Sequence, residues 1–186
     1  MKRPGESLIE VMITIAIMAV GFVILGAVFL AQGRYLDQVN ASSETQYNAF
    51  QVLDAVGLFA SSARAVVASR TINGRSYVSG TNTVVLAMPS IDASGALIAN
   101  STDYVAFGLF QSDRSKFMYD VDAATNSRRV DGQFVKAALV DKLIFRYNAV
   151  IPSNANAVDL FVRTAKTVRG QILRTPLGKI YYLGSS

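Results

Sequence analysis

The chain has 186 residues, 51% of them hydrophobic, and a formal net charge of +5. It contains no cysteine, histidine or tryptophan, which excludes disulfides, a nucleophile–histidine dyad and the usual zinc site. The length suits one membrane segment and one modest domain. No Gly-x-Gly-x-x-Gly loop or acid pair at motif spacing occurs, so the sequence indicates neither an enzyme nor a cofactor.

The N-terminal segment has the length and composition of a membrane-spanning helix. No charged residue occurs from Val11 to Ala31, and at about 1.5 Å per residue this run makes a helix of roughly 30 Å, the thickness of a bilayer's hydrocarbon core. Lys2 and Arg3 precede it, and basic residues before a first membrane helix tend to stay in the cytoplasm. We therefore expect the rest of the chain to lie outside the inner membrane.

Two other kinds of N-terminal segment have to be compared with this one. A secretory signal peptide has an apolar region of about 7–15 residues and a small-residue cleavage site, whereas this run is longer and is followed by Gln32-Gly33-Arg34-Tyr35. A plain N-terminal anchor also stays open. The protein would then belong to a different class, a membrane-anchored domain that keeps its leader. Such an anchor leaves Gly5 and Glu10 unexplained.

The string Gly5-Glu6-Ser7-Leu8-Ile9-Glu10-Val11-Met12 resembles the start of type IV prepilins and of type II secretion pseudopilins. In that family a membrane-embedded peptidase cuts after a glycine and methylates the new N-terminus. The resemblance implies that residues 1–5 are a leader and that Gly5 and Glu6 flank the site of cleavage and N-methylation. It also implies that residues 6–33 form the transmembrane or filament-core half of a helix. The family usually has phenylalanine where Glu6 stands.

Glu10 is the candidate residue for subunit assembly, because the family has a glutamate at this fifth mature position. A carboxylate at the start of a membrane segment costs on the order of 2–3 kcal/mol and requires a partner. We expect Glu10 to pair with the N-terminal ammonium of a neighbouring subunit and to set the axial register of subunits. The alternative is a neutral Glu10 that hydrogen-bonds to Thr14 or to a backbone carbonyl.

The helix is predicted to continue beyond the membrane segment to about Ser69, with residues 34–72 as its amphipathic half. Its apolar stripe recurs at spacings of three and four and consists of Val52, Val56, Phe59, Ala63 and Val66. The pair Asn73-Gly74 is a turn signal that ends this stretch.

Residues 73–186 are predicted to form an exported β-sheet domain, because apolar and polar residues alternate in several short runs. The expected strands are 84–88, a hairpin of 104–110 and 116–122, then 143–149, 158–163, and a last strand or hairpin over 172–183 that is broken at Pro176-Leu177-Gly178. Polar loops are expected at 90–102, 123–135 and 152–157. One long helix followed by strands indicates an α+β fold with an antiparallel sheet, similar to the pilin fold.

The C-terminal part has a looser likeness to the larger minor pilins and the J-type minor pseudopilins. It covers 103–110, 116–122, the basic-polar turn 126–131 and the run 139–147. The likeness implies a minor pilin, a structural subunit of the complex that primes assembly and caps the filament. A major pilin, a type II secretion pseudopilin and a competence minor pilin for DNA uptake stay open.

Two polar clusters are candidates for ligand binding. Asp120, Asp122 and Asn126 are candidate calcium ligands, but the spacing lacks an oxygen ligand at Ala124 and a glycine after it. Solvated acids at a strand end are the preferred interpretation, with no metal. Arg128-Arg129 is the adjacent basic pair of the C-terminal third, and DNA contact through its phosphates is the alternative to an ordinary solvated face.

The resemblance also implies the partners of the chain and its location. The partners are other pilin or pseudopilin subunits, the prepilin peptidase, the inner-membrane assembly platform and, before assembly, membrane lipid. A single N-terminal helix would hold the chain in the cytoplasmic membrane with its C-terminal domain outside. After assembly it would belong to an extracellular or periplasmic filament.

Overall fold

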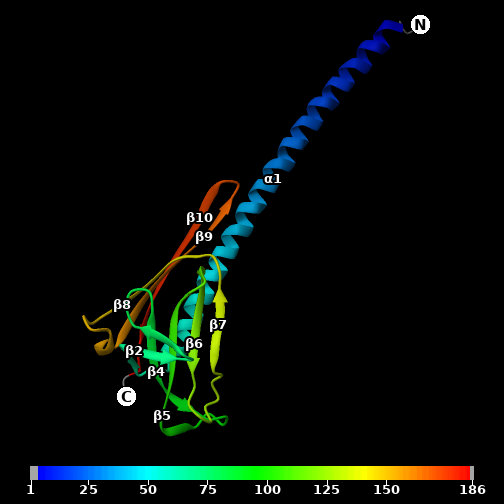
Figure 1. Ribbon diagram of the computed structural model, residues 1–186. Helices are drawn as coiled ribbons and strands as arrows, with labels where there is room; N and C mark the ends of the chain where they lie inside the picture. Colours follow the sequence, from blue (N-terminus) through cyan, green and yellow to red (C-terminus); the bar gives the residue numbers. More distant parts are fainter. Residues whose placement is uncertain (1–3, 185–186) are drawn as a thin grey trace. The chain divides into compact units, whose positions relative to one another are not determined.

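The computed structural model describes residues 4–184, and it describes side chains from Leu8 onward. The chain divides into two compact units, Met1–Ala41 and Ser42–Ser186, which we describe separately. Helix α1 (Pro4–Ala60) begins in the first unit and ends in the second (Figure 1). Ten strands and one 3₁₀ turn follow it. The predicted α+β order of one long helix before antiparallel strands is confirmed.

The described part of the first unit is entirely helical and apolar. The length and composition of α1 from Leu8 would allow it to cross a membrane. From Leu8 to Leu36 its large apolar side chains are exposed, and the charge-free stretch from Val11 to Ala31 lies wholly within the helix. This unit therefore has no core of its own, and its apolar surface needs lipid or other helices to cover it.

Helix α1 ends at Ala60, nine residues before the predicted end at Ser69. The last turn tightens, with the Ser62 amide donating to Phe59 O at 3.0 Å, and the Arg64 amide then donates to Ala87 O in the sheet at 2.8 Å. Ala63 and Val66 are buried as the stripe predicts, but strand β1 (Ala65–Val66) and the turn before it bury them. Helical spacing alone could not distinguish these two ways of burying the same residues.

The larger sheet has five antiparallel strands in the order β1-β4-β5-β6-β7. Its strands are β4 (Val84–Ile91), β5 (Leu97–Phe110), β6 (Asp113–Asp122) and β7 (Gly132–Ala137), besides β1. The predicted hairpin of β5 and β6 is confirmed. The predicted loops at 90–102 and 123–135 are wrong in part, because β5 begins at Leu97 and β7 occupies the end of the second loop. Strand β7 could not be recognised from alternation, because Phe134 and Val135 are adjacent apolar residues in a strand of six.

The smaller sheet has three antiparallel strands in the order β10-β9-β8. They are β8 (Val140–Tyr147), β9 (Ala157–Val168) and β10 (Gln171–Tyr182), and the 3₁₀ turn η1 (Pro152–Asn154) lies between the first two. Strand β9 runs past its predicted end at Arg163, and β10 is not broken at Pro176, which pairs with Arg163. Because β10 is an edge strand, a proline without an N–H is tolerated there.

Strands β2 (Ser69–Ile72) and β3 (Arg75–Val78) form a separate hairpin. Asn73 and Gly74 connect them with φ of 49° and 77°, the positive values that a tight hairpin turn requires. The predicted turn is confirmed, but it closes a hairpin and does not end the helix. Ile72 of this hairpin packs in a small core with Val85 and Ala106 of the large sheet.

The main core of the second unit joins the end of α1 to both sheets. Val52 and Val56 of α1 are buried there together with Phe107 of β5 and Leu160 of β9. Polar contacts fix the helix as well, because the Tyr181 hydroxyl donates to Leu53 O at 2.6 Å. The amphipathic part of α1 that packs on the sheets is therefore Ser42–Ala60.

Candidate functional site

The predicted assembly site lies in the first turns of α1. The backbone of Gly5 and Glu6 is within the helix, but their side chains lie outside the described residues. Glu10 is exposed, and the Thr14 hydroxyl donates to its backbone carbonyl at 2.8 Å. No hydrogen bond or ion pair reaches the Glu10 carboxylate from any side chain between Leu8 and Gly184. Thr14 therefore contacts the main chain at this position and is not a partner for the acid.

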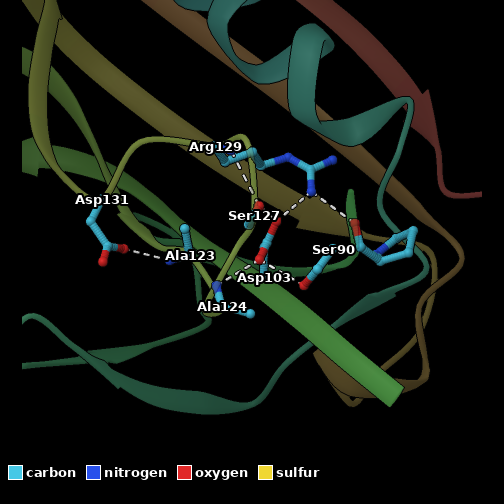
Figure 2. Close-up of polar contacts among 8 residues, drawn as sticks. Ser90, Asp103, Ala123, Ala124, Ser127, Arg129 and Asp131 are labelled. Carbon is cyan, nitrogen blue, oxygen red and sulfur yellow. Dashed lines mark hydrogen bonds and ion pairs between the residues drawn. The ribbon is translucent and has the colours of Figure 1, made fainter. Parts of the chain in front are cut away.

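A second polar site, around Asp103 of β5, was not predicted. Its carboxylate is fully buried and accepts hydrogen bonds from the Ser90 hydroxyl at 2.7 Å and the Ala124 amide at 2.8 Å. The Ser127 hydroxyl at 2.7 Å and the Arg129 guanidinium at 2.5 Å complete the set (Figure 2). One acid of β5 therefore holds the end of β4 and the loop 123–131 together.

The charge of Asp103 is stabilised in place. Burial by itself would raise the pKa of this carboxyl, but the Ala124 amide, the Arg129 guanidinium and the Ser127 and Ser90 hydroxyls outweigh it, and the pKa is lowered. Arg129 also donates to the Pro89 carbonyl at 2.8 Å. Each oxygen of the Asp103 carboxylate accepts two hydrogen bonds from donors of its own chain, so we describe the cluster as a structural clasp.

This clasp changes the interpretation of Arg128-Arg129. The Arg129 side chain is only 13% exposed and its guanidinium is occupied by Asp103, whereas Arg128 is exposed. The two arginines therefore do not form a joint basic surface, and the arrangement gives no support to DNA contact by the pair.

The acids considered for calcium are also held by their own chain. Asp120 is fully buried, accepting hydrogen bonds from Asn73 Nδ2 and the Tyr77 hydroxyl, both at 2.8 Å. The expectation that these are solvated strand-end acids is wrong for Asp120, because the β2–β3 hairpin covers it. Burial and the bond to Asp120 raise the pKa of Tyr77 to about 12. Asp122 pairs with Arg70 at 3.2 Å. Among the described residues, no group of three or more His, Cys, Asp or Glu side chains could hold a metal ion.

One signal in the sequence could have identified Asp103. It stands two residues before Val105 and four before Phe107, so it shares their face of the strand. A lone acid on such a face needs a cation or several donors. Its partner Arg129 lies 26 residues away in sequence, a distance at which no local pattern connects the two.

Comparison with known proteins gives one match, and it falls on the first site. Residues 1–26 match the family described as the prokaryotic N-terminal methylation motif. No curated protein and no solved structure matches the chain. The match covers Gly5, Glu6, Glu10 and most of the charge-free run, together with residues 1–5, the expected leader.

Proposed function

We propose that this chain, which carries the N-terminus of the type IV pilin and pseudopilin family, is a minor pilin of a type IV pilus-like filament. The observation that carries the proposal is the methylation motif over residues 1–26, continued by a helix whose apolar side chains have no cover. The motif supports processing by prepilin peptidase and assembly with other pilin subunits. Such a protein is structural, and we propose no catalytic role for it.

Helix α1 has two successive environments in this proposal. Before assembly, residues 6–33 anchor the chain in the cytoplasmic membrane, with Lys2 and Arg3 inside and the sheet unit outside. After the peptidase removes residues 1–5 and the assembly platform extracts the subunit, neighbouring helices replace lipid around the same side chains. The apolar side chains of α1 are thus covered first by lipid and then by neighbouring helices, which avoids exposing this long apolar surface to water.

Glu10 gives the assembly its register. In lipid or between packed helices an ionised carboxylate needs a cation, and none of the side chains from Leu8 onward supplies one. Cleavage after Gly5 creates an ammonium at Glu6 of each subunit. We infer that Glu10 pairs with this ammonium on a neighbour, so that subunits stop sliding along one another where the charges meet.

A secretion pseudopilin would share all these features. A separate experiment is therefore needed to tell whether the filament is a pilus, a secretion pseudopilus or a DNA-uptake fibre. The competence role is not favoured, since Arg129 is occupied by Asp103. The gene for this chain can be deleted in its host, and surface pili, protein secretion and DNA uptake are then measured. These three measurements distinguish a pilus, a secretion system and a DNA-uptake system. Loss of piliation alone supports the minor pilin, and loss of secretion alone would replace it with a pseudopilin.

The assembly role of Glu10 has a direct test with a matched control. Glu10→Ala should leave cleavage and methylation at Glu6 intact but exclude the chain from sheared filaments. Thr14→Ala removes the neighbouring hydroxyl, which among the described residues bonds to the Glu10 carbonyl alone, and should assemble normally. Incorporation of Glu10→Ala at the normal level would refute the pairing of Glu10 with a neighbouring N-terminus.

A further inference from the structure

A cleft of about 430 Å³ opens in the second unit where the end of α1 meets the large sheet and the loop after β6. Its walls come from Leu58 and Phe59 of α1, Tyr119 of β6, Arg128 and Val130 of the loop, and Phe134 of β7. Its size falls within the range of about 300–1,000 Å³ typical of ligand pockets. We call it the Tyr119 cleft.

The floor of the Tyr119 cleft is aromatic and carries one hydroxyl that no described residue binds. The Tyr119 ring lies 5.2 Å from that of Phe59 and 5.1 Å from that of Phe134. Tyr119 is only 9% exposed, and its hydroxyl makes no hydrogen bond to another described residue. Since no buried side-chain oxygen or nitrogen of the described residues lacks a partner, this hydroxyl is reached by solvent in the cleft and is available to a group that enters there.

The rim of the cleft combines apolar side chains with one available cation. Leu58 and Val130 are 70% and 71% exposed, so both offer apolar surface to a group that enters the cleft. Arg128 is exposed and has no acidic partner in the described part of the chain. The nearby acids are engaged: Asp103 binds Arg129, and Asp131 accepts a hydrogen bond from the Ala123 amide.

We propose that the Tyr119 cleft is a docking site for an acidic, apolar segment of another filament subunit. An aromatic or branched side chain of that segment fills the cleft between Leu58 and Val130. An adjacent aspartate or glutamate pairs with Arg128, and a polar atom of the segment bonds to the Tyr119 hydroxyl. The charge of Arg128 selects for an acidic partner over a basic one. This inference deepens the proposed function and rests on it for the identity of the partner as a subunit.

The probe for this site is a short blocked peptide in which a tryptophan stands between two aspartates. Because the chain has no tryptophan, the fluorescence of the mixture near 350 nm reports the peptide alone. The full-length chain is titrated in detergent micelles, with empty micelles as the blank. A peptide with asparagine in place of both aspartates, and one with lysine, test the requirement for acid.

We expect saturable binding with a blue shift of the tryptophan emission, and binding at least about tenfold weaker for the asparagine peptide. Arg128→Glu should weaken binding of the aspartate peptide by about tenfold or more, and Tyr119→Phe by about threefold. Arg114→Glu is the matched control, because Arg114 is an exposed arginine at the start of β6 and does not line the Tyr119 cleft, and it should bind the peptide as the unmodified chain does.

Three results would overturn the proposal. They are a dissociation constant weaker than about 1 mM for the aspartate peptide, equal binding by Arg128→Glu, or equal loss in Arg114→Glu, which would indicate net charge alone. The N-terminal mass of the same preparation separates this test from the proposed function. If the chain begins at Glu6 but binds no peptide, the proposed filament role stands and the docking proposal is refuted. If the chain begins at Met1, the proposed filament role is refuted, and the titration still shows whether the cleft binds an acidic, apolar segment.

Discussion

Arg129→Ala isolates the contribution of the Asp103 clasp to the stability of the sheet unit. The change removes the ion pair at 2.5 Å and the bond to Pro89 O at 2.8 Å, and it leaves a fully buried carboxylate. Breaking a buried pair costs about 3–5 kcal/mol when the remaining charge is uncompensated. Three donors still reach Asp103, from Ser90, Ala124 and Ser127, so we expect a loss of about 2–3 kcal/mol.

Urea unfolding of the full-length chain in detergent, followed by the near-ultraviolet signal of its tyrosines, measures this loss. With a slope of about 2 kcal/mol/M for a unit of this size, the midpoint should fall by about 1–1.5 M. Arg128→Ala is the neighbouring control, and as an exposed substitution it should stay within about 0.5 kcal/mol of the unmodified chain. Equal shifts for the two variants would refute the role assigned to the clasp.

Three further changes test the fold. The folded-state pKa of Asp103 is lowered, so the unfolded chain binds more protons than the folded chain as the pH falls. The stability that ionised Asp103 contributes should therefore be complete above about pH 4 and disappear as the pH falls through the folded-state pKa. Asp103→Asn should be less stable at neutral pH and lose less stability on acidification, and parallel curves of urea midpoint against pH would contradict this. Tyr181→Phe removes the 2.6 Å bond to Leu53 O and should cost about 1 kcal/mol, measured as the midpoint shift; no shift would mean that the bond adds nothing. Gly74→Ala places a side chain at φ +77° with no atom within 4 Å, so thermal unfolding should show a loss of about 1 kcal/mol from backbone strain alone, and an unchanged midpoint would argue against that turn geometry.

The order of helix and strands could be predicted because it depends on local periodicity. The predicted hairpin of 104–110 and 116–122 depends on such short periodic runs, and it forms as β5 and β6. The end of α1 could not be predicted, since Ala63 and Val66 satisfy a helical spacing equally well. Pro176 illustrates the same difficulty in a strand: whether a proline breaks a strand depends on whether the strand lies at an edge, which is a property of the whole sheet.

The two kinds of site differ in how far the sequence reveals them. Glu10 could be chosen as a candidate because a carboxylate stands out within the surrounding apolar run, which is contiguous in the chain. Asp103 and Arg129 acquire their roles from contact across 26 residues, and their individual surroundings look ordinary. The adjacent pair Arg128-Arg129 suggested one basic surface, but the structure gives its two members different surroundings, one in the clasp and one at the rim of the Tyr119 cleft.

The most direct test of the filament role is the N-terminal mass and sequence of the chain purified from its native host. We predict a chain that begins at Glu6 and carries one added methyl group, because the peptidase would have cut after Gly5 within the methylation motif. A chain that still begins at Met1 would contradict the account. It would leave a membrane-anchored α+β protein in which Glu10 has a different role.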